Sequence, residues 1–173
     1  FCGKYFVDEL VKNENFQKAN YKRALEETFL RMDAILMGEN AMDILREFKN
    51  EAEGQTFAGC TANVVLVTKT EIYCANAGDS RCYLFTKEGQ CIPMSTDHKP
   101  DNEIERQRIH AAGGYVSEGR VNDNLNLTRA IGDLEYKKNG GLKPEEQIIS
   151  AFPDVKLHPR LPNLSFRLIG CEG

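Results

Sequence analysis

Residues 59–85 read Gly-Cys-Thr-Ala-Asn-Val-Val-Leu-Val-Thr-Lys-Thr-Glu-Ile-Tyr-Cys-Ala-Asn-Ala-Gly-Asp-Ser-Arg-Cys-Tyr-Leu-Phe. Three runs within it, at 61–67, 72–77 and 81–85, have the β-branched, apolar and aromatic content of strands. The polar Lys-Thr-Glu after the first run predicts a hairpin, and the Gly-Asp-Ser before the third predicts a tight turn. Because the apolar runs are nearly continuous, we expect these strands to be covered on both faces inside a layered domain.

Asp79 is the one carboxylate in the Gly-Asp-Ser turn. Aspartate is common in turns because its side chain accepts hydrogen bonds from the nearby backbone, and this is one interpretation. The other is a metal-binding or water-binding carboxylate at the end of the sheet. The turn alone favours the first interpretation, so the second needs support from elsewhere in the chain.

The composition indicates one domain that interacts with neither nucleic acid nor membrane. A chain of 173 residues can bury one core. Its net charge is −4, and its basic residues are scattered, which argues against a nucleic-acid partner. No apolar run has the length of a transmembrane helix, and the start lacks a secretory signal. Since the chain begins at Phe1 and stops at Gly173 after a strand-like run, we expect a central piece of a longer polypeptide.

The six cysteines show no metal-ligand spacing. They form no C-x-x-C pair, which argues against zinc. Four of them lie in strand-like stretches, so we expect buried free thiols in a reducing compartment, the cytoplasm or nucleus. The six are Cys2, Cys60, Cys74, Cys82, Cys91 and Cys171.

Several helices are predicted around the strands. From Asn20, apolar residues recur every three or four positions, which predicts an amphipathic helix of about five turns ended by Gly38. Shorter helices are predicted over 1–11 and from Met42 to Phe48, followed by a polar linker at 50–55.

The second half of the chain mixes loops, a helix and strands. Pro100 and the acids after it begin a helix through 104–112, and His98 before it is expected to fix a loop by hydrogen bonding. The basic, glycine-rich segment 137–144 is predicted to be a mobile surface loop. Further strands are predicted at 148–150, 154–157 and 164–170, which completes an α+β protein.

Six short motifs together resemble the metal-dependent Ser/Thr protein phosphatases of type 2C (the PPM family), in that family's order and over nearly the whole chain. They are Gly-Cys-Thr-Ala at 59–62, Ala-Asn-Ala-Gly-Asp-Ser-Arg at 75–81, Asp-His-Lys-Pro at 97–100, Ala-Gly-Gly at 112–114, Arg-Val-Asn-Asp-Asn-Leu-Asn-Leu-Thr-Arg-Ala-Ile-Gly-Asp at 120–133 and Pro-Asp-Val at 153–155.

This resemblance implies a fold, a cofactor and a reaction. The fold is an antiparallel β-sandwich flanked by helices in four layers (αββα), of which residues 1–173 are the central part, incomplete at both ends. The cofactors are two Mg²⁺ or Mn²⁺ ions at one end of the sandwich. They activate a bridging water that hydrolyses phosphoserine or phosphothreonine in protein substrates, since hard divalent cations take carboxylate ligands and lower the pKa of bound water.

The resemblance also implies roles for single residues. Asp79 matches the carboxylate that orients metal-bound water or helps to hold a further ion, and Thr61 matches a threonine that lines the site. Arg120 and Asn122 belong to the flap beside the substrate cleft, where Asn122, Arg129 and Asp133 are expected to fix the shape of the flap.

Two departures from the family pattern matter. The Asp-Gly-His-Gly-Gly and Asp-Asn metal motifs, and an upstream phosphate-binding arginine, are absent, so the fragment by itself is expected to be inactive. Glu172 stands where the family has a metal-ligand aspartate. Its extra methylene displaces the carboxylate by about 1 Å, and a Mg²⁺ site tolerates such a shift poorly.

Two functions therefore remain open from the sequence. The first is a metal-dependent phosphatase whose activity belongs to the complete protein. The second is a pseudophosphatase that serves as a docking or scaffold module in a larger assembly, because Glu172 does not replace the aspartate fully.

Overall fold

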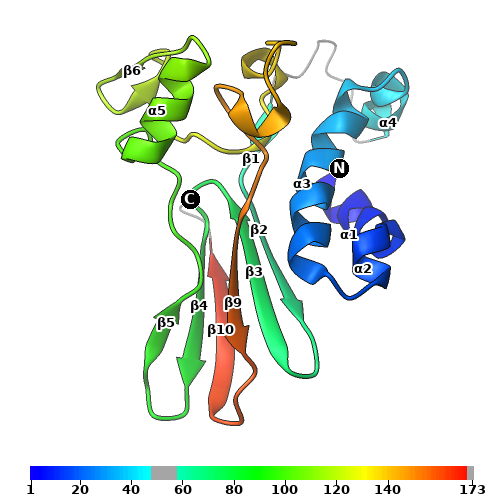
Figure 1. The fold of residues 1–173 in the computed structure, drawn as a ribbon, viewed down its shortest axis with the longest axis vertical. Coiled ribbons are helices and arrows are strands. Elements are labelled where there is room, and N and C mark those ends of the chain that lie inside the picture. Colours follow the sequence, from blue (N-terminus) through cyan, green and yellow to red (C-terminus); the bar gives the residue numbers. More distant parts are fainter. Residues whose placement is uncertain (48–57, 171–173) are drawn as a thin grey trace.

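The computed structural model describes residues 1–47 and 58–170 and shows helices packed beside and above a sandwich of strands (Figure 1). No helix in these two ranges is long and apolar enough to span a membrane. The α-helices are α1 (Cys2–Lys12), α2 (Glu14–Gln17), α3 (Tyr21–Met37), α4 (Ala41–Arg46) and α5 (Glu103–Ala111).

The strands form two three-stranded antiparallel sheets, ordered β2-β3-β9 and β10-β4-β5, and two short pairs, β1-β8 and β6-β7. They are β1 (Gly59–Cys60), β2 (Ala62–Val67), β3 (Glu71–Ala77), β4 (Arg81–Thr86), β5 (Cys91–Pro93), β6 (Val116–Ser117), β7 (Arg120–Val121), β8 (Ile131–Gly132), β9 (Asp154–Pro159) and β10 (Leu164–Gly170). Two 3₁₀ helices, η1 (Leu134–Tyr136) and η2 (Pro144–Glu146), lie between β8 and β9.

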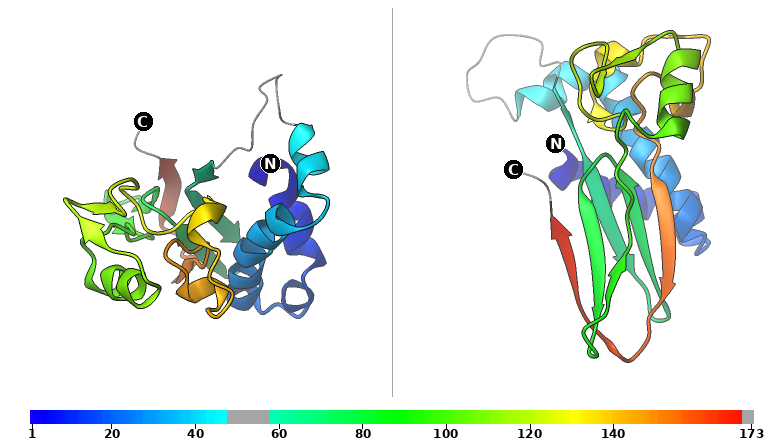
Figure 2. Two further views of the ribbon diagram at one scale, coloured as in Figure 1. Left: turned by 90° about the horizontal axis from the view of Figure 1, so that it is seen from above. Right: turned by 90° about the vertical axis from the view of Figure 1, so that its left-hand side faces the viewer.

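Consecutive strands β3 and β4 lie in different sheets. The Gly-Asp-Ser turn at 78–80 therefore carries the chain from one layer of the sandwich to the other. Figure 2 shows the two sheets side by side, with the axes of their strands roughly aligned. The turn thus lies at one end of the sandwich, where the two sheets meet.

Strand β3 is buried on both faces, as its continuous apolar sequence predicts. Tyr73, Ala75 and Ala77 pack with the buried side chains of α1 and α3. Ile72 and Cys74 point the other way and pack with buried residues of β4. This alternation confirms an α+β sandwich, because successive residues of a strand face opposite layers. The described helices that cover a sheet, α1 to α3, lie on the β2-β3-β9 side (Figure 1).

Helix α3 follows the sequence prediction closely. It ends before Gly38, and a single stripe of its surface is buried. The buried residues are Ala24, Leu25, Thr28, Phe29, Met32 and Asp33.

The prediction of a surface loop at 137–144 was wrong for its first residue, Lys137, whereas residues 138–141 are exposed as predicted, and the mobility of the segment stays a prediction. Lys137 is only 8% exposed, and its Nζ donates to Asp33 Oδ2 (2.5 Å) and to the carbonyl of Ala130 (2.7 Å). Downstream, Gln147 Nε2 donates to the carbonyls of Asn139 (2.8 Å) and Leu142 (3.1 Å). These buried contacts hold the segment against α3, and they join residues too far apart in sequence for local patterns to reveal.

Two further predictions need correction. Residues 148–150 form no strand but a single bridge between Ser150 and Arg129. Cys74 and Cys82 are buried as expected, whereas Cys60 and Cys91 are exposed. The reason is that β1 and β5 are short edge strands, which leave their side chains open to solvent. The polar linker predicted at 50–55 lies outside the described residues.

Candidate active site at the end of the sandwich

The turn between β3 and β4 has a backbone conformation that requires glycine. Gly78 has φ +118°, and a Cβ atom built there would lie 2.4 Å from Thr61 Cγ2. Thr61 Oγ1 also lies within hydrogen-bond distance, 2.8 Å, of Ser80 Oγ. Thr61 therefore packs against the residues on both sides of Asp79, so the structure brings these two predicted site residues together.

His98 fixes the same turn from the opposite direction. The buried imidazole accepts a hydrogen bond at Nδ1 from the Gly78 amide (3.1 Å), and the His98 amide donates to the Gly78 carbonyl (3.0 Å). Asn76 Nδ2 donates to that carbonyl as well (3.0 Å). His98 thus fixes a loop, as its sequence position predicted.

The acceptor role of Nδ1 sets the tautomer of His98. The ring proton then resides on Nε2, which lies 3.2 Å from Asp154 Oδ2. This contact with His98 lowers the pKa of Asp154, and the charge of Arg129 lowers it further, whereas burial acts in the opposite direction. Asp154, at the start of β9, is thereby connected through the ring to the Asp79 turn.

The Asp79 carboxylate itself is partly exposed, at 18% of its side-chain surface, and pairs with the Nζ of Lys99. The segment that carries Lys99 is fixed by Arg81, which binds Asp97 with two hydrogen bonds of 2.9 and 2.7 Å. Hydrogen bonding to Arg81 also lowers the pKa of Asp97. Sequence reasoning missed both pairs. Each pair joins one residue of the Asp-His-Lys-Pro motif to one residue of the Gly-Asp-Ser-Arg motif. The sequence showed these two motifs separately and gave no indication that they meet.

Behind the turn lies a buried network of charged groups centred on Glu105 of α5, whose carboxylate accepts hydrogen bonds from Arg108 Nη1 (2.6 Å), Arg129 Nη2 (2.5 Å) and Thr128 Oγ1 (2.6 Å). Burial alone would raise the pKa of Glu105, but the hydrogen bond from Arg129 and the charges of both arginines outweigh it and lower the pKa to about 2. Arg129 Nη1 also reaches Asp154 Oδ1 (2.9 Å), which ties the network to β9.

Of the predicted flap residues, Arg120 begins β7 and Asn122 directly follows it. The β6-β7 hairpin lies beside α5 (Figure 1). Asn122 Oδ1 accepts from the Tyr115 amide (3.0 Å), and exposed Arg120 donates from Nη1 to the Asn124 carbonyl (2.6 Å). These contacts are internal to the hairpin. No hydrogen bond or ion pair of the described chain joins Arg120 or Asn122 to Asp79.

The described residues do not by themselves assemble a two-metal site. In residues 1–47 and 58–170 no group of three His, Cys, Asp or Glu side chains is placed to hold an ion. Asp79 is there a single carboxylate paired with Lys99. Glu172, the other predicted metal ligand, lies outside the described residues.

The fold is that of an α+β domain, a sandwich of two antiparallel sheets flanked by helices. Its candidate site is the carboxylate of Asp79, on the turn where the chain crosses from one sheet to the other. The family model described as protein phosphatase 2C matches residues 1–173, and the chain belongs to this family.

Similar curated proteins carry phosphatase names. The chain is 51% identical to "Probable protein phosphatase 2C 3" of Paramecium tetraurelia, over all of this chain and 57% of that protein. It is 44% identical to "Protein phosphatase 2C homolog 2" of Schizosaccharomyces pombe, over all of this chain and 44% of that protein. The chain thus spans about half the length of these curated relatives.

A solved structure supports the fold. A phosphatase from Toxoplasma gondii superposes with a TM-score of 0.66 at 26% identity, covering 98% of this chain and 62% of that one.

Proposed function

We propose that the full-length protein hydrolyses phosphoserine and phosphothreonine in proteins, in a reaction that depends on Mg²⁺ or Mn²⁺. Membership of the protein phosphatase 2C family and the phosphatase names of its relatives support this. The observation that carries it is the partly exposed Asp79 carboxylate on a turn that Thr61 and His98 hold in place.

The chemistry of this carboxylate suits the proposed cofactor. Mg²⁺ and Mn²⁺ prefer oxygen ligands, and in two-metal hydrolysis they activate water and offset charge on phosphoryl oxygens. The residues on both sides of Asp79 are held by Thr61 and His98, so the backbone that carries this carboxylate is fixed in position. Lys99 acts as its counter-ion and would compete with any cation bound there.

The test is phosphate release from a phosphothreonine peptide by the full-length protein, with and without Mn²⁺. We expect Mn²⁺-dependent turnover, reduced by roughly 10- to 100-fold in Asp79→Asn. Asp8→Asn, which changes an exposed carboxylate on α1, is the matched control and should leave turnover unchanged. A folded full-length protein without metal-dependent turnover would overturn the proposal.

The protein's partners and location form part of the same proposal. We expect phosphoproteins as substrates, neither nucleic acid nor membrane as partners, and docking into a larger assembly as a further possibility for the complete protein. The free thiols of the described cysteines suit the cytoplasm or nucleus. The scaffold alternative depends on Glu172, and no contact of a described residue favours it.

A further inference from the structure

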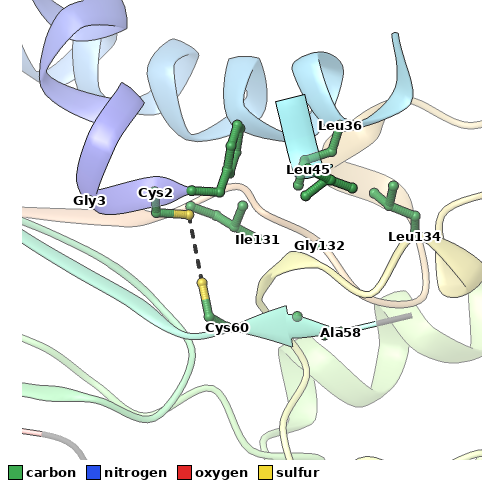
Figure 3. A pocket seen from close by; sticks show the side chains of 11 residues that line it. Cys2, Gly3, Leu36, Leu45, Ala58, Cys60, Ile131, Gly132 and Leu134 are labelled. Atoms are coloured by element: carbon green, nitrogen blue, oxygen red, sulfur yellow. Dashed lines mark hydrogen bonds between the residues drawn. The ribbon is translucent and has the colours of Figure 1, made fainter. Parts of the chain in front are cut away.

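Two cysteines that are far apart in the sequence lie close together in the structure. Cys2, in the first turn of α1, and Cys60, on β1, place their Sγ atoms 3.8 Å apart although 58 positions separate them in the sequence. Figure 3 shows the two side chains pointing toward each other. A disulfide requires about 2.05 Å between the sulfurs, so they need to approach by less than about 2 Å.

The pair is open to small solutes. Cys60 is exposed and Cys2 is half-buried. Both line a cavity of about 430 Å³ with apolar walls that include Leu36, Ile131 and Leu134 (Figure 3). A small uncharged oxidant therefore has access to both sulfurs.

The contact also shifts the pKa values of the two thiols in opposite directions, which gives them different chemical roles. The hydrogen bond from Cys2 lowers the pKa of Cys60 to about 7, and the same contact together with burial raises the pKa of Cys2. A thiol with a pKa near ambient pH is the best nucleophile toward oxidants. Cys60 is thus suited to react first and Cys2 to resolve the product.

A second pair of cysteines provides a contrast within the same molecule. Cys74 and Cys82 adjoin one another between the sheets but are buried, and their contact and burial raise the pKa of Cys74. Proximity is therefore common to both pairs, whereas exposure to solvent belongs to the first pair alone.

We propose that Cys2 and Cys60 form a dithiol oxidation site that hydrogen peroxide converts reversibly into a disulfide. The Cys60 thiolate attacks one peroxide oxygen, which forms an S–O bond, breaks the O–O bond and releases hydroxide. The Cys2 thiol then attacks the sulfenic sulfur, forms the S–S bond and releases water. Two electrons pass from the sulfurs to the peroxide oxygens, and the two thiol protons leave in two molecules of water. A dithiol reductant reverses the bond.

The disulfide would join the start of α1 to β1, directly before Thr61. Closing a loop of this length restricts the unfolded chain, so oxidation should raise the thermal midpoint by roughly 5 °C or more. The site is independent of the phosphatase proposal, because its formation requires neither metal nor turnover.

The experiment treats the folded full-length protein with graded hydrogen peroxide, blocks the remaining thiols and maps cysteine peptides by mass spectrometry. We expect a Cys2–Cys60 cross-linked peptide, lost after dithiothreitol, with Cys74 and Cys82 still reduced. The thermal midpoint should rise in the oxidised protein and return on reduction.

Single variants distinguish the specific pair from general oxidation. Cys60→Ser and Cys2→Ser should each abolish the cross-link and the rise in thermal midpoint, whereas Cys91→Ser, at another exposed cysteine, should leave both intact. Circular dichroism of the reduced variants verifies folding, and Cys60→Ala or Cys2→Ala replaces the serine variant at the same position if that variant fails to fold. Overoxidation of Cys60 without a bond to Cys2, or a Cys91 disulfide in its place, would overturn the proposal.

Discussion

At the residue scale, the candidate site depends on a few buried polar atoms. The Gly78 amide has its hydrogen-bond acceptor in His98 Nδ1, and the Gly78 carbonyl accepts from both His98 and Asn76. Buried polar groups that lose a partner cost free energy out of proportion to the bond removed. The position of Asp79 therefore depends on the buried side chains of His98 and Asn76.

Replacing His98 tests this dependence. His98→Ala leaves the buried Gly78 amide unpaired and opens a cavity, so we expect a loss of about 2–4 kcal/mol in the free energy of unfolding, measured with urea. His110→Ala is the matched control, because His110 is exposed on α5. Equal, small effects from both substitutions would contradict the role given to His98.

Gly78 offers a second test at this scale. Gly78→Ala and Gly89→Ala both place alanine at positive φ, but a Cβ at Gly89 meets no atom within 4 Å, while one at Gly78 meets Thr61. Both substitutions strain the backbone, more so at Gly78 (φ +118°) than at Gly89 (φ +81°), so the difference measures the close approach together with that extra strain. We expect Gly78→Ala to cost about 1–3 kcal/mol more in urea unfolding, and equal costs would argue against tight packing of Thr61 on the turn.

At the element scale, a buried ion pair fastens α3 to the segment after β8. Asp33 Oδ1 accepts from the Gly132 amide (2.7 Å), and its other oxygen accepts from Lys137. Burial raises the pKa of Asp33 and lowers that of Lys137, which shows how much hydration both groups give up. The pair thereby fixes where the helix meets β8, and β8 pairs with the strand that carries Cys60.

A double-mutant cycle measures this connection. Lys137→Met leaves a buried carboxylate uncompensated, and we expect it to lower the free energy of unfolding by about 3–5 kcal/mol. Lys137→Met combined with Asp33→Leu should recover much of that loss, because apolar residues can replace a buried pair. Lys138→Met, at the exposed neighbouring lysine, should change little. Additive single effects would mean that the two groups act separately.

At the scale of the whole molecule, Glu105 connects segments that are far apart in the sequence. It brings together α5, the Thr128–Arg129 segment and, through Arg129, the first residue of β9. Helix α5, which lies above the sandwich (Figure 1), is thus connected to the β2-β3-β9 sheet by charge, through Arg129 and Asp154. The apolar cluster around Ile109 and Val121 instead packs the helix and the β6-β7 hairpin against the segment between Leu125 and Ile149.

This network predicts how stability changes in acid. The pKa of Glu105, about 2, lies below its ordinary value of 4.5, so its contribution is complete above pH 4.5 and is lost as pH falls through 2. The shift corresponds to about 3 kcal/mol. Urea unfolding of wild type and Glu105→Gln should therefore differ most at neutral pH and converge in acid. Glu103→Gln, exposed on the same helix, is the control, and a difference independent of pH would contradict the prediction.

The sequence by itself determined much of the fold. The periodicity of residues 21–37 specified α3, and the continuous apolar run of β3 required cover on both faces, because each follows from the geometry of one element. Ordered motifs likewise identified the family and singled out Asp79 and Thr61. Their assigned roles remain predictions, as do those of Arg120 and Asn122.

Only the tertiary structure decided which distant groups meet. Lys137 looked like part of a solvated loop, and nothing near it in sequence revealed that Asp33 would bury it. The same holds for His98 with Asp154, Lys99 with Asp79, and Cys2 with Cys60. Local sequence patterns indicate which face of its own helix or strand a residue occupies. Pairing across layers depends on how those elements pack, and that is a property of the whole chain.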